Sequence, residues 1–295
     1  MALKTVQAII NGQTYTLSLN TATGKYEATI TAPASSSYPK DGHYYPVTVK
    51  ATDQAGNTTT VDDTDSTLGS KLRLTVKEKV APSIKITAPT ANQLMAQNKP
   101  AITFEVTDND SGVDTSSVVL KVDGTAVSGL TSAAIAGGYR YTYTPATALA
   151  DGEHTVTVNA SDNDGNAATQ ATLSFRVLAT APNLSITNPA DNSWSKTATV
   201  SYAGTTDAAK LTVKVGTGTA QNVTITNGAF SGNITLPEEG ENTVTFVATS
   251  ESGVTTTIVR TINLDTKPPV FTDVSITPNP VDAGATYVIS VTLTD

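Results

Sequence analysis

Apolar and polar residues alternate along most of the chain with the two-residue period of a β-strand. After Asp151, for example, the side chains of Val156, Val158 and Ala160 share one face, and polar residues fill the positions between them. No window places apolar residues at helical spacing, and Thr, Ser, Ala, Val, Asn and Gly dominate the composition. The pattern predicts an all-β protein with almost no helix.

Two sequence signatures recur along the chain. The first is a proline-led start, "VAPSIKITAPTAN" from Val80, which returns as "TAPNLSITNPADN" from Thr180 and more loosely as "KPPVFTDVSITPNP" from Lys267. The second is an acidic-glycine turn, a strand and an Asp/Asn/Gly turn, which begins at Asp41 and Asp151. Short strands with turns every 8 to 12 residues, in units of roughly 100 residues, predict tandem immunoglobulin-like β-sandwiches in a linear array.

These residues resemble bacterial immunoglobulin-like repeat proteins. The similarity extends to the Ig-like proteins of prophages and tailed phages of gut Firmicutes and to bacterial surface adhesins. It is carried by the proline-led starts and by the pattern "DG…VTV.A.D..GN" at Asp41 and Asp151. The resemblance implies a structural or adhesive role. The third unit departs most from the pattern, because "TSESG" from Thr249 replaces the acidic turn.

The repeats divide the chain into four segments. Residues 1–79 are expected to form an Ig-like unit that lacks strands A and B, and residues 267–295 to form only an A–B strand pair. Between them, 80–179 and 180–266 are expected to be complete domains. In the first complete domain the predicted strands are A Ser83–Thr87, B Ala101–Thr107, C Ser117–Val122, E Tyr139–Thr144, F Thr155–Ser161 and G Thr172–Leu178.

The two ends of the chain match the two sides of one loop. Aligning "VQAIINGQ" with "VVLKVDGT" makes the first strand a strand C, and the final "VTLTD" ends as strand B does at Asp108. We expect the A–B pair to complete unit 1–79 of a neighbouring chain, head to tail, which would place Asp295 beside Asp53. A boundary drawn through a longer repeat protein, or a partner strand from another protein, would explain the same ends.

The composition excludes several kinds of chemistry. There is no cysteine, so disulfides and thiolate catalysis are absent. A net charge of −8 without a Lys/Arg cluster argues against nucleic acid as a partner. The two histidines, His43 and His154, occupy equivalent places in two repeats, which favours loop positions over a ligand pair.

No segment has the apolar run that membrane insertion needs, and the N-terminus lacks the apolar stretch of a secretory signal. A protein synthesised in the cytoplasm and released by lysis is therefore expected, with its final place on a virion or at the cell exterior.

Acidic residues are concentrated in two loops of the first complete domain. In Ig topology the B–C and F–G loops lie at the same end of the sandwich, so their carboxylates should approach one another. Carboxylates and carbonyls are the hard oxygen ligands that Ca²⁺ takes. The candidate calcium ligands are Asp108, Asp110, Asp114, Asp162 and Asp164. The alternative is that Asp and Asn are present because such turns need local side-chain hydrogen bonds.

Three tyrosines alternate on the predicted strand E. Tyr139, Tyr141 and Tyr143 share a face, with Arg140 and Thr142 on the other. Such a row could stack on sugar rings as a surface binding platform, or it could be partly core, since every second residue of a sandwich strand points inward.

No nucleophile elbow, phosphate loop, HExxH or Cys/His metal set occurs in the chain. The sequence therefore predicts a non-enzymatic structural or adhesive protein, of a phage virion in the first instance. The alternatives are a bacterial adhesin stalk and a glycan-binding accessory module of a secreted enzyme. The expected partners are copies of itself, other virion or surface proteins, or a host-surface glycan, and calcium is the one candidate cofactor.

Overall fold

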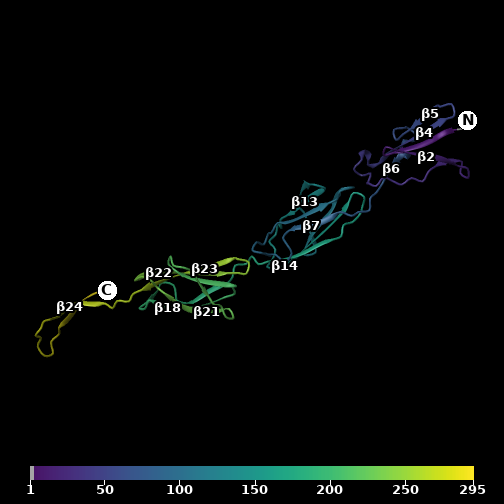
Figure 1. Cartoon of the computed structure of the whole chain (residues 1–295). Helices are drawn as coiled ribbons and strands as arrows, with labels where there is room; N and C mark the ends of the chain where they lie inside the picture. The colour runs from purple at the N-terminus through teal and green to yellow at the C-terminus, as the bar shows by residue number, and fades with distance from the viewer. Residues whose placement is uncertain (1–2) are drawn as a thin grey trace. The chain divides into compact units, whose positions relative to one another are not determined.

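The structure is a computed structural model that describes residues 3–295 (Figure 1). Within these residues there are 25 strands and two short 3-10 helices, Asp41–His43 (η1) and Gly69–Leu72 (η2). The all-β prediction is confirmed. One compact unit runs to Val177 and the other begins at Leu178. No helix in the described part of the chain has the length and apolar character needed to cross a membrane.

The first complete domain expected from the sequence is called here the second sandwich, because it follows the leading sheet. It spans Ser83–Val177 and consists of two sheets. One has the strand order β11-β10-β14-β15-β8 and the other β12-β13-β9-β7. Its strands are β7 Ser83–Ala88, β8 Leu94–Met95, β9 Ile102–Thr107, β10 Val113–Val122, β11 Thr125–Ala126, β12 Thr131–Ile135, β13 Gly138–Tyr143, β14 Gly152–Asp162 and β15 Ala171–Val177. Alternating residues of β9 and β14 point inward, so Phe104, Val156 and Val158 are fully buried between the sheets.

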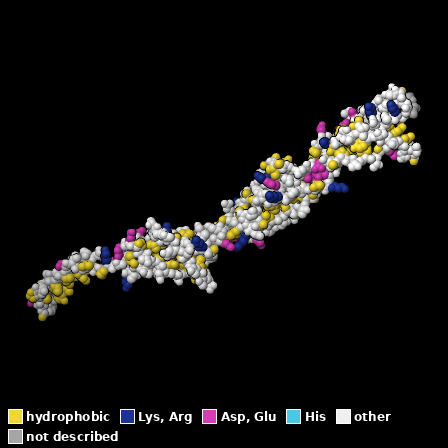
Figure 2. All heavy atoms as spheres, in the orientation of Figure 1, with side chains coloured by type: hydrophobic (Ala, Val, Ile, Leu, Met, Phe, Trp, Pro, Cys, Tyr) yellow, Lys and Arg dark blue, Asp and Glu magenta, His cyan; other side chains and the backbone are white. Residues whose placement is uncertain are grey.

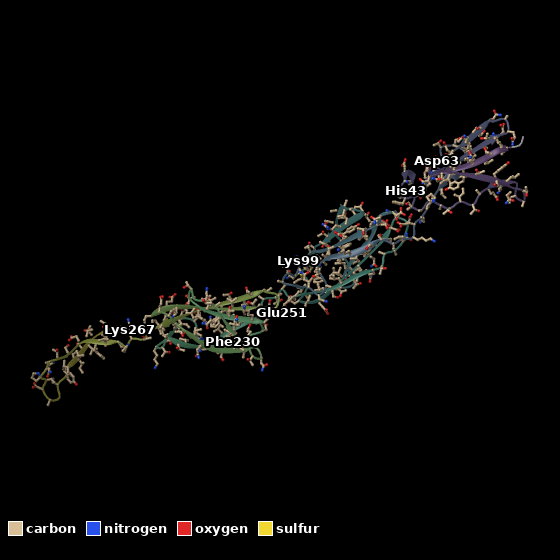
Figure 3. The ribbon with its side chains drawn as sticks, viewed as in Figure 1. His43, Asp63, Lys99, Phe230, Glu251 and Lys267 are labelled. Atoms are coloured by element: carbon tan, nitrogen blue, oxygen red, sulfur yellow. The ribbon has the colours of Figure 1, made fainter. Side chains whose placement is uncertain are left out.

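The third sandwich, Leu184–Leu264, repeats this plan with the sheets β16-β18-β21 and β17-β23-β22-β19-β20. Its strands are β16 Leu184–Asn188, β17 Ser193–Ser195, β18 Thr199–Thr206, β19 Lys210–Val215, β20 Gln221–Val223, β21 Ala229–Thr235, β22 Gly240–Thr249 and β23 Thr255–Leu264. Phe230, labelled in Figure 3, belongs to its core with Tyr202 and Phe246. Gly204 is required there, because a Cβ would lie 2.1 Å from the Ser185 carbonyl oxygen.

The leading sheet, Leu3–Leu74, has the strand order β3-β2-β1-β4-β5, and β6 pairs with β4. Its strands are β1 Leu3–Ile10, β2 Gln13–Asn20, β3 Lys25–Glu27, β4 Tyr45–Asp53, β5 Thr58–Val61 and β6 Arg73–Leu74. The strand β1 covers the stretch that the sequence analysis expected to be a strand C, and the buried side chains Val6 and Ala8 lie on one of its faces. On the neighbouring strand, Val47 and Val49 are only half-buried.

The terminal hairpin consists of β24 Val270–Thr277 and β25 Val288–Thr294, which pair only with each other among the described strands. Every residue of both strands is exposed. Figure 2 shows hydrophobic side chains gathered over this C-terminal segment.

Each predicted strand of the second sandwich overlaps an observed one, but strand F begins at Gly152 instead of Thr155 and several other features differ. Strand C begins at Val113 instead of Ser117, because a register shift between Asp114 and Val119 lets the strand continue past an irregularity. The strands β8, β11 and β12 of this sandwich were not predicted, and neither was β17 of the third sandwich. β8 and β17 pair in parallel with β15 and β23. His154 is not a loop residue as expected, since it lies inside β14 and is buried.

Candidate metal centre

Asp162 closes the turn between β14 and β15. Its Oδ1 accepts a hydrogen bond from the Asn166 backbone N–H at 2.8 Å, and its Oδ2 accepts one from Asn166 Nδ2 at 2.7 Å. The Asp162 N–H donates in turn to the Asn166 carbonyl at 3.1 Å. These bonds fix the carboxylate while the residue is only 2% exposed.

Asp108 holds the loop between β9 and β10. Its Oδ1 accepts from the backbone N–H groups of Asp110 at 3.0 Å and Gly112 at 2.7 Å. Gly112 has a positive φ of 81°, which suits glycine and allows its N–H to turn back toward Asp108. The loop therefore directs one carboxylate toward the F–G turn.

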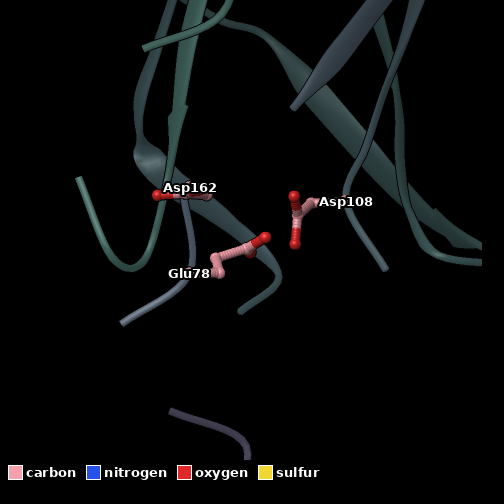
Figure 4. Close-up of side chains that lie close together, drawn as sticks. All are labelled: Glu78, Asp108 and Asp162. Atoms are coloured by element: carbon pink, nitrogen blue, oxygen red, sulfur yellow. The ribbon is translucent and has the colours of Figure 1, made fainter. Parts of the chain in front are cut away.

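Glu78 supplies a third carboxylate from the segment that precedes the second sandwich. Its Oε1 accepts from the Ser111 N–H at 2.9 Å, and its carbonyl accepts from Asn166 Nδ2 at 3.2 Å. One carboxylate oxygen each of Glu78, Asp108 and Asp162 lies within 4.8 Å of the others (Figure 4). The structure therefore brings Asp108 and Asp162 together as predicted, with a partner that the sequence analysis missed.

The other three predicted ligands have different partners. Both Asp110 oxygens accept from the Ser36 N–H at 3.0 Å, and Asp164 Oδ2 accepts from the Glu78 N–H at 2.9 Å. Asp114 accepts from the Ser116 hydroxyl at 2.6 Å and N–H at 2.9 Å, and these bonds lower the pKa of Asp114. Asp110 and Asp164 thus bind the preceding segment, and Asp114 lies on β10, where it bonds Ser116.

The third sandwich makes the same turns with hydroxyl groups. Ser250 Oγ accepts from the Val254 N–H at 3.0 Å, as Asp162 does from Asn166, and Thr206 Oγ1 accepts from the Ala208 N–H at 3.1 Å, as Asp108 does from Asp110. Leu178 stands at the position that corresponds to Glu78. Closing these turns therefore requires an oxygen acceptor but not a carboxylate.

The three carboxylates of the second sandwich could hold a divalent cation. Ca²⁺ takes six to eight oxygen ligands as a rule, so backbone carbonyls and water would complete the set. A cation there would offset the mutual repulsion of the three charges. The Ser111 hydroxyl, in the same loop, is buried and has no hydrogen-bond partner among the described residues.

The tyrosine row is divided between core and surface. Tyr141 is 4% exposed, and its ring stacks on Phe104 with centroids 5.2 Å apart. Burial raises the pKa of Tyr141. Tyr139 and Tyr143 are half-buried. Tyr141 therefore presents no ring face to a sugar. Of the three tyrosines, only Tyr139 and Tyr143 reach the surface.

His154 fastens the turn that begins strand F. Its Nδ1 lies 2.7 Å from Asp123 Oδ2 and its Nε2 lies 2.8 Å from the Ala150 carbonyl oxygen. Burial works against the charged ring, but the bonds to Asp123 and Ala150 raise the pKa of His154 above its usual value. Both ring nitrogens face acceptors, so the site favours the doubly protonated imidazolium.

Two family models match the two sandwiches separately. Residues 81–177 match the model described as bacterial Ig-like domain. Residues 182–266 match the model described as glucodextranase, domain B. The chain is a tandem repeat of Ig-like sandwiches. Among curated proteins, none matches this chain.

Solved structures with similar folds are distant. The fibronectin(III)-like modules of Clostridium thermocellum CbhA are 17% identical, cover 62% of this chain and 94% of their own, and have a TM-score of 0.35. A 1.5-MDa bacterial ice-binding adhesin is 19% identical, with 90% of this chain and 87% of that chain covered and a TM-score of 0.37. Protocadherin gammaB7 EC3-6 is 12% identical over 99% of this chain and 78% of its own, with a TM-score of 0.34.

Proposed function

We propose that this chain is a non-enzymatic structural repeat that serves as a spacer or adhesive segment outside the cell, on a bacterial surface or on a virion. The observation that carries the proposal is a clamp: loops of a sandwich bind the segment of chain that precedes it. A spacer needs such contacts, because an unrestrained linker would let successive domains bend freely.

The clamp of the second sandwich joins it to the leading sheet. Asp110 accepts from the Ser36 N–H, and Asp164 accepts from the Glu78 N–H. Lys77 Nζ also donates to the Asp164 carbonyl at 3.0 Å. Ser36 is fully buried in this contact. Three donors from the preceding residues are therefore held by two loops.

The third sandwich has a clamp of the same kind on its own leading segment. The Ser252 hydroxyl donates to the Leu178 carbonyl, and the Thr256 hydroxyl donates to the Pro182 carbonyl. Ser252 occupies the position of Asp164 in the F–G turn. Asp207, in the loop after β18, also accepts from the Asn183 N–H at 2.8 Å and from Asn183 Nδ2 at 2.6 Å. The clamp thus recurs with two hydroxyls and one carboxylate, which supports a mechanical role for these contacts beyond closing the turns.

Localisation tests the proposal directly. Gold-labelled antibody against the chain, applied to intact producing cells and to particles released from them, should label one of these outer surfaces. Label on the cells favours an adhesin stalk, and label on the particles favours a virion component. Label confined to the cytoplasm of sectioned cells would overturn the proposal.

A second candidate is a glycan-binding accessory domain, which the match of 182–266 to glucodextranase domain B favours. The third sandwich has a hollow lined by the exposed residues Gln221, Asn233 and Glu238, among others, whose polar atoms could bond sugar hydroxyls. Screening the chain on a glycan array tests this candidate. Saturable binding that Asn233→Ala weakens would support it, and no binding to any glycan would exclude it.

A further inference from the structure

We propose that the third sandwich binds a neutral sugar chain on the outer face of its larger sheet, with Trp194 as the stacking residue and Asn263 and Glu241 as hydrogen-bonding residues. The expected ligand is a chain of glucose-type pyranose rings, whose equatorial hydroxyls leave two apolar ring faces. The proposal goes beyond the spacer role. It rests on the second candidate function, glycan binding, and names the residues and the class of sugar for it.

Trp194 is a large aromatic side chain that lies outside the core. It is the only tryptophan of the chain, and on the short strand β17 it is 73% exposed. The core of this sandwich is formed without it, by Tyr202, Phe230 and Phe246 among others. The corresponding residue of the second sandwich is the half-buried Leu94, since β8 pairs with β15 as β17 pairs with β23. An indole in water gives up the free energy that burial would provide, so Trp194 serves a surface.

Two polar side chains continue the row that Trp194 begins. In the strand register, Trp194 lies beside Asn263 of β23, and Asn263 lies opposite Glu241 of β22. Paired residues point to the same face of a sheet, and adjoining strands lie about 4.8 Å apart. Ile262 and Leu264 are buried, so Asn263 between them points outward. Among the described residues, neither the Asn263 amide nor the Glu241 carboxylate takes part in a side-chain hydrogen bond, so both are available to a ligand.

One aromatic ring beside two hydrogen-bonding side chains matches the two kinds of surface on a pyranose. The C–H groups of one ring face can pack on the indole, while hydroxyls at the rim bond the Asn263 amide and the Glu241 carboxylate. A protein partner would need a wider apolar centre. The next pair on this face, Thr243 and Thr261, carries hydroxyl groups instead. The row therefore favours a sugar over an apolar partner.

The row is acidic at its Glu241 end. Glu238, Glu239 and Glu241 are all exposed there. A carboxylated or sulfated sugar would be repelled by these groups, so the row fits a neutral sugar better. Glu238 and Glu241 also line the hollow of the third sandwich, so a sugar chain that stacks on Trp194 can extend toward that hollow.

The second sandwich has the same row of positions without the aromatic ring. Leu94 lies beside Arg176 of β15, and Arg176 lies opposite Glu153 of β14. Glu153 and Arg176 are exposed in this sandwich too, which is followed in the chain by a complete sandwich. Of the two sandwiches, only the third combines an outward row with an aromatic ring, and the residue of the second sandwich supplies a matched control.

Tryptophan fluorescence of the full chain tests the stacking directly, because Trp194 is its only source. Maltohexaose, cellohexaose and laminarihexaose are neutral glucose chains of different linkage, and at least one of them should shift the emission saturably. Asn263→Ala and Glu241→Ala should each raise the Kd for that sugar roughly two- to tenfold, the effect of one lost hydrogen bond. Thr257→Ala, on the same face of β23 but far from Asn263, should leave the Kd unchanged.

Calorimetry of the Trp194 variants completes the test. Trp194→Leu, which introduces the residue of the second sandwich, should abolish binding of the same sugar, and Trp194→Phe should retain part of it. An emission that none of the three sugars changes would overturn the proposal. A glycan that binds the unmodified chain and Trp194→Leu equally well on an array would also overturn it, while the second candidate function would stand. No binding to any glycan would overturn both.

Discussion

Carboxylates in place of hydroxyls at two loop positions distinguish the second sandwich from the third. Asp108 and Asp162 bond the same backbone groups that Thr206 and Ser250 bond in the third sandwich. A hydroxyl is sufficient for the turn in the third sandwich, so closing such a turn does not require a negative charge. Calcium binding would give that charge a function, and it stays a prediction.

At the scale of single residues, removing calcium tests whether the three carboxylates bind an ion. With a bound ion, the melting temperature of the second sandwich should be higher in millimolar calcium than in chelator, because a ligand at a hundred times its Kd adds about 2.7 kcal/mol to the unfolding free energy. Glu78→Gln should abolish most of the difference, and Asp114→Asn, outside the group, should preserve it. Equal melting temperatures in calcium and chelator would mean that the carboxylates only close turns.

His154 predicts a pH-dependent contribution to stability. Because the folded-state pKa of His154 is raised above the unfolded value of about 6.5, its contribution is complete below that value and is lost as the pH rises through the folded-state pKa. His154→Gln should therefore lower the unfolding free energy more at about pH 5 than at about pH 9. Denaturant titrations at both pH values measure this, and equal losses would rule out the charged His154–Asp123 pair.

At the scale of the element, strands with long alternating stretches could be predicted and short ones could not. The alternation in β9 and β14 is strict enough to give their position and inward face from sequence alone. β8 and β17 contain two and three residues, too few to show a period, and they pair in parallel with a distant strand. These strands form only because folding brings them beside β15 and β23.

The candidate site was predictable only in part for a similar reason. The order of the loops in the Ig topology was enough to predict that Asp108 and Asp162 lie close together. Glu78 lies in a segment with no strand pattern, and it joins the group through tertiary hydrogen bonds to Ser111, Asp164 and Asn166. Asp114 was misplaced because strand C starts four residues earlier than predicted, which puts Asp114 on β10 instead of in the loop.

The clamp predicts a local effect of one substitution. Asp164→Ala removes the acceptor of the Glu78 N–H, and a hydrogen bond to a charged group contributes about 1.5–3 kcal/mol. Hydrogen exchange at the Glu78 amide should accelerate by roughly tenfold or more. Asp164→Asn keeps an acceptor oxygen and should show a smaller change. Unchanged exchange in Asp164→Ala would show that the bond does not hold the linker.

A substitution in the core of the second sandwich should lower the unfolding free energy of the whole domain. Phe104 is fully buried and stacks on Tyr141, so Phe104→Ala should cost about 3–5 kcal/mol of unfolding free energy through lost burial and a cavity. Val119→Ala, at a side chain that is 38% exposed, is the matched control and should cost far less. Denaturant unfolding measures both, and similar costs would contradict the assigned core.

For the whole molecule, the account rests on sandwiches that have their own cores and are connected through clamped segments. The core of the third sandwich is formed entirely by residues between Leu184 and Leu264. The leading sheet and the second sandwich belong to one compact unit, with the Ser36–Asp110 and Glu78–Asp164 bonds between them.

Backbone ¹⁵N relaxation of the full chain tests this claim most directly. If the clamp holds, amides of β1 and β4 and amides of β9 and β14 should fit a single rotational diffusion tensor, and a chain with Asp110→Ala and Asp164→Ala together should require two. Two independent tensors in the unmodified chain would contradict the account, because the linker would then be a free hinge and the loops would not hold it.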